Sequence, residues 1–321
     1  MSVQDKAAKK ASARLDILLG LTLVGLLLLM WLFLAVTVPQ SFLQWNNFAN
    51  ILRQGSMVAI LALGQTFVII TGGIDLSVGA VEGFCSLIIA LMLQNGWPVW
   101  LAIAGTLGIG LAIGMFHAFG VVQLGLPPFI MTLATLTAIR GFGQLITSAS
   151  ISITDDNFTG FAVGDFLTIP NLFWLVVLVA VPGYFFLHQS RWGRYLFAIG
   201  SNKEAARLSG VKVQRITYIA YMLSSLCAAF VGVMLAMRLG IGSFFQGEGD
   251  ELKSIASSVI GGTSLFGAVG SIHGPLLGSF ILTTINNGAN LLGINNAWQK
   301  VITGGLIIVI VYFDNLRRRK N

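Results

Sequence analysis

Long apolar runs separated by short polar stretches dominate the pattern of hydrophobic and polar positions along the chain. Each run is long enough, at roughly 20 residues, to cross a hydrocarbon core about 30 Å thick. Lipid offers the backbone no hydrogen bonds, so a spanning segment must be a helix or part of a closed barrel. The apolar residues are continuous rather than alternating, which favours helices.

These runs predict ten membrane-spanning helices. The predicted spans are residues 15–37, 55–71, 77–94, 99–121, 127–147, 171–187, 216–238, 252–266, 273–292 and 298–314. The second span is short, and the eighth is both short and polar. The sequence thus predicts an all-α polytopic membrane protein with one transmembrane domain, residues 1–321, whose spans cover about 15–314.

Composition agrees with this class of protein. The 321 residues are 55% hydrophobic and 10% charged, whereas a soluble domain carries about 25% charged residues. The net charge is +7, and the positive-inside rule explains it without nucleic-acid binding. Cys85 and Cys227 lie inside predicted spans without disulfide or metal spacing, so we expect buried thiols and no metal site.

The distribution of charges sets the predicted orientation. With a cytoplasmic N-terminus and ten spans, most bases fall on the cytoplasmic side. These bases are Lys6, Lys9, Lys10, Arg14, Arg191, Arg194, Lys203, Arg207, Lys212, Arg215, Arg317, Arg318, Arg319 and Lys320. The outer loops 148–170 and 239–251 carry acids and no base. Both termini and the long loop 188–215 are therefore expected in the cytoplasm.

Two Gly-rich stretches suggest an internal repeat. AILALGQTFVIITGGIDLSVGAVEGF (59–84) resembles SIASSVIGGTSLFGAVGSIHGPLLGSF (254–280). Each has a short apolar run, then two glycines, then a Gly-spaced start of the next helix. An offset of five helices would give a 5+5 inverted repeat, a common transporter plan. Short Gly-rich stretches also recur by chance in membrane proteins, so both interpretations stay open.

The stretch TGGIDLSVGAVEG (71–83) interrupts the apolar pattern between two spans. Its two adjacent glycines can end one helix, because glycine tolerates the left-handed C-terminal turn. Asp75 or Ser77 can cap the next helix by accepting from its free N–H groups. Asp75 is then expected at or just inside the cytoplasmic edge of the membrane.

The same stretch also carries a second acid and a small-residue face. Gly79 and Gly83 form a G-x-x-x-G pattern that lets another helix approach closely. Glu82 is seven positions from Asp75, so both lie on one helix face. Acids inside a membrane are costly and often functional. Asp75, Ser77 and Glu82 therefore either cap and pair within the fold or line a translocation path or gate.

Three asparagines fall inside the ninth predicted span. Asn286 and Asn290 lie one turn apart on one helix face, and Asn287 is next to them in the sequence. Amides at this depth can hydrogen-bond neighbouring helices. The alternative is a pore lining along which the hydroxyl groups of a solute can pass.

The loop SRWGRYLFAIGSNKEAARLSGVKVQRI (190–216) contains a short predicted helix from Asn202 to Leu208, stopped by Gly210. Asn202 is its expected N-cap, and Glu204 lies in the first turn, where an acid is favoured. Its apolar residues are Ala205, Ala206 and Leu208. They predict a docking element for a partner protein, although a basic loop held by anionic lipid is the simpler alternative.

Four bases depart from the positive-inside pattern near outer helix ends. They are Arg53, Arg238, Lys253 and Lys300. Snorkelling explains any one of them, whereas all four together would form an outer basic rim for an acidic partner. Arg140, deep in the fifth span, can pair with Asp75 or Glu82.

The chain has no phosphate-binding loop of the form G-x-x-x-x-G-K-[ST], so it should not hydrolyse ATP itself. It has no catalytic Ser/His/Asp arrangement either, and we expect no enzyme activity. Few acids lie inside the predicted spans, which disfavours an ion-coupled carrier.

Four stretches together carry a resemblance. TGGIDLSVGA, AIGSNKEAARLSGV, DELKSIASSVIGGTSLFGAVG and NNGANLLGI resemble the permease subunits of monosaccharide ABC importers, of the ribose-type branch. The resemblance runs from about Asn46 to Asp314. It departs from the family pattern at SIHGPLLG and VEGFCSL, which leaves the substrate in doubt. The related branched-chain amino-acid permeases are the second candidate, followed by an ion-coupled carrier and a scaffold that transports nothing.

The resemblance implies a dimer of permease subunits, identical or different, in the bacterial inner membrane. It implies an ABC ATPase pair on the cytoplasmic side that binds ATP and Mg, and a periplasmic or lipid-anchored sugar-binding protein outside. This chain itself would need no cofactor. The residues that match the ATPase-coupling helix are Asn202, Glu204, Ala205, Ala206, Arg207, Leu208 and Gly210.

Overall fold

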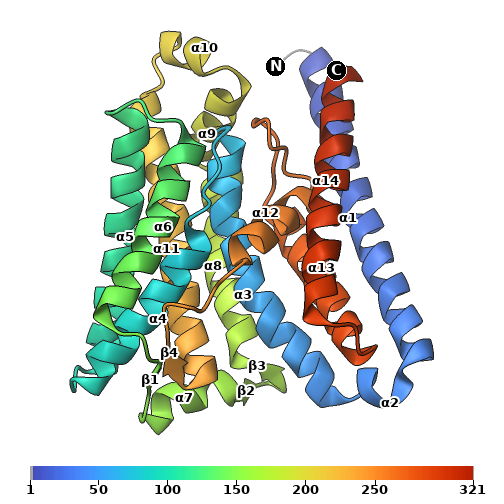
Figure 1. Ribbon diagram of the computed structural model, residues 1–321. Helices are drawn as coiled ribbons and strands as arrows, with labels where there is room; N and C mark the ends of the chain where they lie inside the picture. The colour runs from blue at the N-terminus through green and yellow to red at the C-terminus, as the bar shows by residue number, and fades with distance from the viewer. Residues whose placement is uncertain (1–2, 321) are drawn as a thin grey trace.

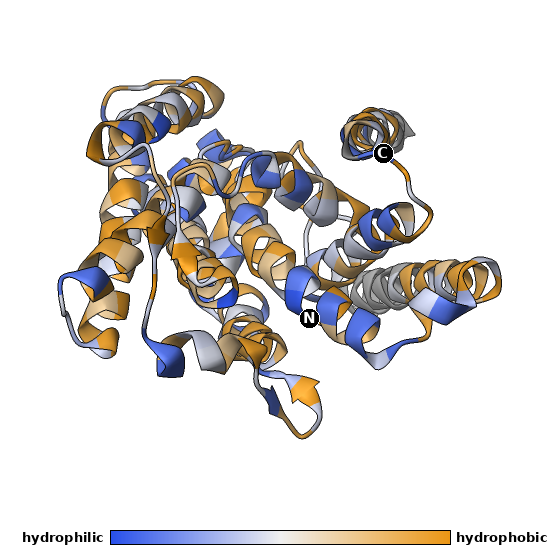
Figure 2. Cartoon of the chain, turned by 60° about the horizontal axis from the view of Figure 1, so that its bottom comes forward, coloured by the Kyte–Doolittle hydropathy of each residue, from blue (hydrophilic) through white to orange (hydrophobic). Residues whose placement is uncertain are grey.

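Helices make up nearly all of the regular structure in the computed structural model, which describes residues 3–320 (Figure 1). The predicted cytoplasmic bases Lys6, Lys9, Lys10, Arg14, Arg317, Arg318, Arg319 and Lys320 have side chains outside the described residues. Hydrophobic residues occupy most of the helices, and hydrophilic residues gather at loops and helix ends (Figure 2).

Within the part of the chain that the structure describes, six helical segments are long and apolar enough to cross a membrane. They belong to α1 (Val3–Thr37), α3 (Trp45–Ile70), α5 (Val99–Val122), α6 (Pro128–Ile146), α8 (Asn171–Tyr184) with the π-helical turn η1 (Phe185–Gln189), and α11 (Val213–Leu239). The class of all-α membrane protein is therefore confirmed. The remaining predicted spans coincide with α4 (Val78–Gln94), α12 (Asp250–Ile260), α13 (His273–Leu291) and α14 (Asn296–Lys320).

The smaller elements lie at the two ends of the molecule. The upper end in Figure 1 carries α9 (Arg191–Ser201), α10 (Lys203–Leu208), the N-terminal end of α1 and the C-terminal end of α14. The lower end carries α2 (Pro39–Phe42), α7 (Asp156–Val163) and two short antiparallel strand pairs. The pairs are β1 (Ile151–Ser152) with β4 (Ile241–Gly242), and β2 (Asp165–Phe166) with β3 (Ile169–Pro170).

The centre of the bundle is formed by α3 and α11, most of whose residues are buried. They pack against each other, and both contact neighbours on several sides. α11 also packs on α4 and α5, and α3 packs on α12, α13 and α8. The outer helices α1, α5, α6 and α8 expose most of their apolar surface, as expected for helices that face lipid.

Two crossings of the bundle are only partly helical. A first unwound segment (residues 71–77) separates α3 from α4, and a second (residues 243–249) leads from β4 into α12. In Figure 1 the second segment rises from the lower end to the start of α12 at mid-height. The prediction of a full helical span over 252–266 was wrong. α12 ends at Ile260, and at 1.5 Å per residue such a short helix covers only about half of the membrane.

The two Gly-rich stretches compared in the sequence do not form an inverted pair. Their Gly-Gly turns follow α3 and α12, the second and eighth predicted spans, so they are six spans apart. The loop after the second turn lies beside the end of α3, because the Ala268 N–H donates to the Ile70 carbonyl at 2.9 Å.

Gly79 and Gly83 do permit a close approach, but not by a helix. An added Cβ at either glycine would collide with backbone of the second unwound segment, which packs directly on α4. Gly83 faces the carbonyl oxygens of Phe244 and Gln246. The small-residue face was thus predicted correctly, whereas the expected helical partner was wrong.

Gly83→Ala is expected to destabilise the protein by about 1–3 kcal/mol, the usual cost of overpacking. A lowered melting temperature of the purified protein in detergent would measure this loss. Gly141→Ala in α6 is the matched control, because an added Cβ there meets open space. Equal melting temperatures for the two variants would contradict the close packing.

Candidate functional site

Asp75 is buried inside the bundle, because the residue has no exposed surface. Its Oδ1 accepts from the Ser77 backbone N–H at 3.0 Å and from the Ser77 hydroxyl at 2.6 Å. Its Oδ2 accepts from the Ser224 hydroxyl of α11 at 2.8 Å. Ser77 is the N-cap of α4 by position, but its side chain caps no helix N–H. The capping prediction was therefore wrong for Ser77, whose hydroxyl instead binds Asp75.

The backbone around Asp75 is also fastened to α3. The Gln65 amide, oriented to suit its neighbours, donates to the Asp75 carbonyl at 3.1 Å and accepts from the Asp75 N–H at 3.2 Å. Thr132 of α6 accepts from the Leu76 N–H at 3.2 Å. Asp75 and its neighbours thus tie the first unwound segment to α3, α6 and α11.

Glu82 is also buried, with 1% of its surface exposed, and faces the second unwound segment. The expected pairing of Arg140 with Asp75 or Glu82 is not formed among the described residues. Arg140 instead donates to three backbone carbonyls: Phe244, Gln246 at 2.7 Å and Gly79 at 3.3 Å. Its guanidinium therefore holds the second unwound segment against α4.

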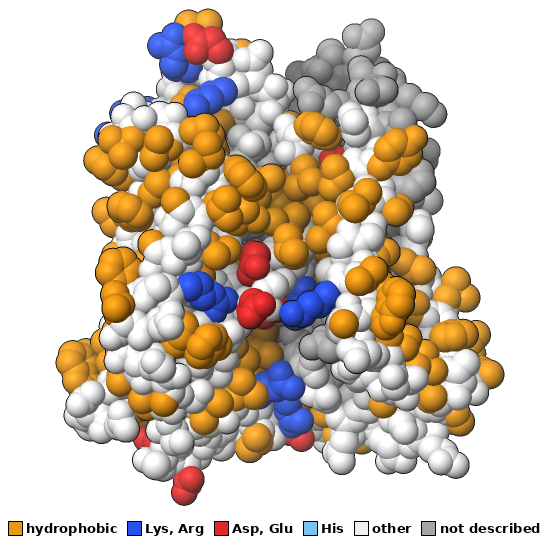
Figure 3. All heavy atoms as spheres, viewed as in Figure 1, with side chains coloured by type: hydrophobic (Ala, Val, Ile, Leu, Met, Phe, Trp, Pro, Cys, Tyr) orange, Lys and Arg blue, Asp and Glu red, His pale blue; other side chains and the backbone are white. Residues whose placement is uncertain are grey.

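A polar groove lies beside this contact. Acidic and basic side chains gather at mid-height on this face of the molecule, over α12 (Figure 3). The groove has a volume of about 590 Å³. Its lining residues are Gln54, Glu248, Gly249, Glu251, Leu252, Lys253, Asn286, Asn290, Gln299, Lys300, Thr303 and Gly304.

The three predicted asparagines separate into two environments. Asn286 and Asn290 both line the groove, as their spacing on one helix face indicated. Asn287 points elsewhere and donates to Asn47 Oδ1 of α3 at 2.7 Å. Asn287 therefore bonds two helices together, whereas Asn286 and Asn290 face the groove, where Asn290 Oδ1 accepts from Gln299 at 2.6 Å.

The groove is lined by charges of both signs. Lys253 pairs with Asp250 at 2.6 Å, and Lys300 lies 4.0 Å from Glu248. Its lining residues include two acids, Glu248 and Glu251, and these two lysines, although Lys253 is paired with Asp250 outside the lining. The groove therefore offers both donors and acceptors.

The four bases expected to form an outer rim lie in two different places. Lys253 and Lys300 belong to the groove. Arg53 pairs with Asp165 at 3.0 Å near the lower end, and Arg238 donates to Asn50 at 2.9 Å. The prediction of one continuous basic rim was therefore wrong.

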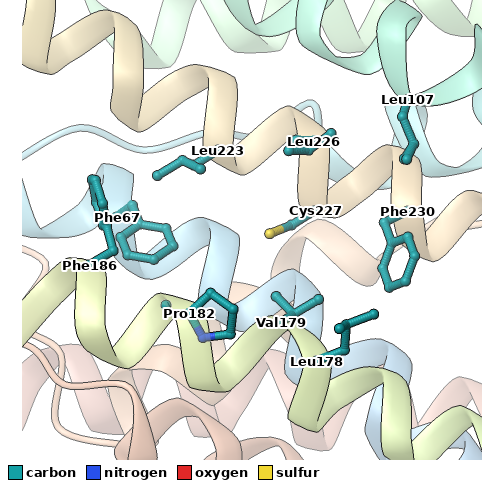
Figure 4. Close-up of a pocket in the computed structure, with 11 residues that line it drawn as sticks. Phe67, Leu107, Leu178, Val179, Pro182, Phe186, Leu223, Leu226, Cys227 and Phe230 are labelled. Atoms are coloured by element: carbon teal, nitrogen blue, oxygen red, sulfur yellow. The ribbon is translucent and has the colours of Figure 1, made fainter. Parts of the chain in front are cut away.

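An apolar cavity of about 410 Å³ lies between α8 and α11 (Figure 4). Leu178, Val179, Leu223, Leu226 and Phe230 are among its lining residues. This lining offers almost no hydrogen-bonding groups. The cavity cannot replace the water around a polar solute, so the groove is the better candidate site.

The predicted short helix of the upper loop is present as α10. Asn202 caps it by accepting from the Ala205 N–H at 2.9 Å, and Gly210 follows it with a φ of +84°. Glu204 pairs with Arg207 at 2.5 Å, and this hydrogen bond lowers the pKa of Glu204.

The apolar residues of α10 point in different directions. Ala206 is buried against the body of the protein, whereas Leu208 is 76% exposed at the tip of the upper end. Ala205 is exposed as well. The helix therefore packs on the protein through the methyl group of Ala206, and its Leu208 side chain is exposed to a possible partner.

The chain belongs to the family described as branched-chain amino acid transport system / permease component, whose model matches residues 47–311. No solved structure matches the chain.

Curated relatives cover most of the chain. A probable ABC transporter permease of Sinorhizobium fredii is 38% identical over 304 residues, 94% of this chain and 90% of the relative. The ribose import permease protein of Escherichia coli (strain K12) is 36% identical, over 92% of this chain and 94% of the relative. The xylose transport system permease protein of the same strain is 31% identical, over 93% and 92%.

Sequence reasoning missed the second unwound segment and the groove acids Glu248 and Glu251. The run QGEGDELK (246–253) held the signal, since two glycines stand directly before a polar helix and four charges gather around its start. That run was interpreted as an outer loop because it follows a predicted span. Its return into the bundle depends on contacts with α4 and α6 that are distant in sequence.

Asp75→Ala is expected to destabilise the protein by about 1–3 kcal/mol for each hydroxyl left without an acceptor. Asp75→Asn should destabilise the protein less than Asp75→Ala, because the amide oxygen still accepts one of these hydrogen bonds. Melting temperatures in detergent measure both variants, with the exposed Asp156→Asn as control. A wild-type melting temperature for Asp75→Ala would refute the structural role.

Proposed function

We propose that this chain is the membrane-spanning permease subunit of an ATP-driven ABC importer for a monosaccharide, such as a pentose, a hexose or a related polyol. Relatives named as ribose and xylose permeases, at 36% and 31% identity over most of the chain, support this substrate class. The chain would be a transport subunit and not an enzyme, and a separate subunit would bind ATP and Mg.

We infer the class of substrate from the side chains that line the groove. Four amides, one threonine hydroxyl and charges of both signs suit the many hydroxyl groups of an uncharged sugar. Leu252 is the one large apolar side chain among its described lining residues. A branched-chain amino acid, which the family description names, would need an apolar wall for its side chain. The groove therefore favours a sugar.

We infer the topology from the same arrangement. Ten segments cross the membrane, with α4 and α12 completed by the two unwound segments. The upper end, with α10 and both chain termini, then faces the cytoplasm. This agrees with the basic residues of loop 188–215 and of both chain ends.

A 5+5 inverted repeat would pair α3 with α11, α4 with α12 and α5 with α13. The packing supports this correspondence, because α3 contacts α12 and α13 as α11 contacts α4 and α5. Each unwound segment also leads into the shorter helix of its half. The repeat would thus set two broken crossings around one site at mid-depth, as in many transporters.

The partners follow from the surfaces of the molecule. ABC ATPase subunits would dock on α10, and an extracytoplasmic sugar-binding protein, periplasmic or lipid-anchored, would dock at the lower end near Arg53 and Arg238. The charged groove cannot face lipid at low cost. A second permease copy, identical or related, would cover it and complete the path in the bacterial inner membrane.

In this mechanism the binding protein delivers a sugar to the lower end of the groove. Asn286, Asn290 and the groove charges replace its hydration with weak hydrogen bonds, because tight binding would trap the solute. ATP-driven closure of the ATPases moves α10 and rocks the helices. Asp75 and Ser77 hold the first unwound segment during this movement, and Glu82 faces the second segment rather than the sugar.

Uptake of labelled pentoses, hexoses, polyols and branched-chain amino acids tests the function. The cells would express the permease with its binding protein and either an intact or a Walker-mutant ATPase. We expect uptake of one sugar that is lost with the ATPase mutation. Uptake that ignores this mutation but is abolished by a protonophore would establish an ion-coupled carrier instead.

Substitutions on α10 should abolish uptake and leave the amount of protein in the membrane unchanged. Leu208→Asp removes the exposed apolar contact, and Arg207→Glu reverses the charge of an exposed pair that adds little stability. Ala206→Trp would displace α10, because Ala206 is buried against the body of the protein and a tryptophan is much larger. Uptake and membrane abundance are measured together, with the exposed Asn95→Ala at the opposite end as control. Normal uptake in all three variants would contradict docking on α10.

A further inference from the structure

Four parts of the chain meet where α4 and α12 begin. They are the first turn of α4 at Gly79, the second unwound segment at Gly247, the first turn of α12 at Glu251, and Arg140 of α6. An added Cβ at Gly79 would meet both the Gly247 carbonyl and Glu251 Oε2. All these groups therefore lie within a few ångströms of one another.

Two carboxylate oxygens at this meeting point have no partner. Glu82 Oε2 and Glu251 Oε2 are buried and receive no hydrogen bond from any described residue. A Cβ added at Gly247 would lie 3.0 Å from Glu82 Oε2, so this acid faces the second unwound segment. Buried carboxylates without donors are unfavourable.

The neighbouring charges already have partners, with one exception. Lys253 is bound to Asp250, and Lys300 lies beside Glu248. Arg140 attracts both Glu82 and Glu251 electrostatically but pairs with neither. Its guanidinium donates hydrogen bonds to backbone carbonyls, although a carboxylate would be a stronger acceptor for it.

We propose that Arg140 is a two-position latch for the second unwound segment. In the arrangement described here its guanidinium binds the carbonyls of Phe244 and Gln246 and holds the segment on α4. In a second state of the transport cycle it turns to Glu82 and Glu251, and the segment is released. The latch rests on the proposed function, because it needs a transport cycle with two states.

The second unwound segment lies where its release would open the groove. Ser243 and Phe244 are buried beside α4 and α6, whereas Glu248 and Gly249 line the groove. The segment therefore separates the loops of the lower end from the groove. Its release would open the groove toward the side where the binding protein docks, so Arg140 is a positioning residue of the outer gate. The two packed arrangements form a discrete switch.

A single cysteine can report the release. Ser243 is 4% exposed and small, so Ser243→Cys should be tolerated in a chain whose Cys85 and Cys227 are replaced by alanine. The intact permease–ATPase complex, in right-side-out membrane vesicles, is treated with a membrane-impermeant maleimide from the outer side. The rate of labelling is measured at rest and during ATP turnover with the binding protein.

The latch predicts opposite effects for its two positions. Arg140→Lys should raise the resting labelling rate about tenfold or more, the factor expected for losing a hydrogen bond made by a charged group. Glu82→Gln combined with Glu251→Gln should keep labelling slow during turnover and reduce uptake. Arg215→Gln, at an exposed position on α11, is the matched control and should behave like wild type.

Melting temperatures separate a latch from a purely structural contact. Variants that fold as stably as wild type but label as predicted would support the latch. Wild-type labelling and uptake in the double glutamine variant would overturn it, as would slow resting labelling in Arg140→Lys. The labelling needs ATP turnover but no particular solute, so a failed sugar panel with intact labelling would reject only the substrate.

Discussion

Backbone groups inside a membrane need hydrogen-bond partners that lipid cannot supply. The backbone groups of two unwound segments need such partners here, and buried polar side chains supply many of them. Gln65 and Thr132 bind the backbone of the first segment, and Arg140 binds the carbonyls of the second. The charged and polar residues of the interior are therefore consequences of interrupting two helices, which in turn places a polar groove at mid-height.

Side-chain size makes these interruptions possible. The second segment can lie on α4 only because Gly79 and Gly83 have no Cβ in its way. The same contact brings Glu82, Glu251 and Arg140 together from three helices. Close backbone packing and buried charge are thus one feature of the fold, and each would be unstable without the other.

Local signals in the sequence were enough for features built within a few residues. Asn202 caps α10 through a partner three residues away, and Gly210 ends it, so both could be predicted. The apolar runs likewise located the six described helices that are long and apolar enough to cross a membrane. Asp75 shows the limit, because its partner Ser224 is 149 positions distant. The groove likewise joins residues of α3, α12, α13 and α14, and no local pattern indicates which side chains of separate helices share one space.

The lack of charge on the proposed solute has an electrical consequence. Membrane potential does work of about 2.3 kcal/mol on each elementary charge moved through 100 mV. An uncharged sugar carries no charge across, because the lysines and acids of the groove stay with the protein. The voltage of the cell can then neither drive nor oppose its passage. The direction of transport would depend on the chemistry of the nucleotide alone, and import would continue in a depolarised cell for as long as ATP lasts.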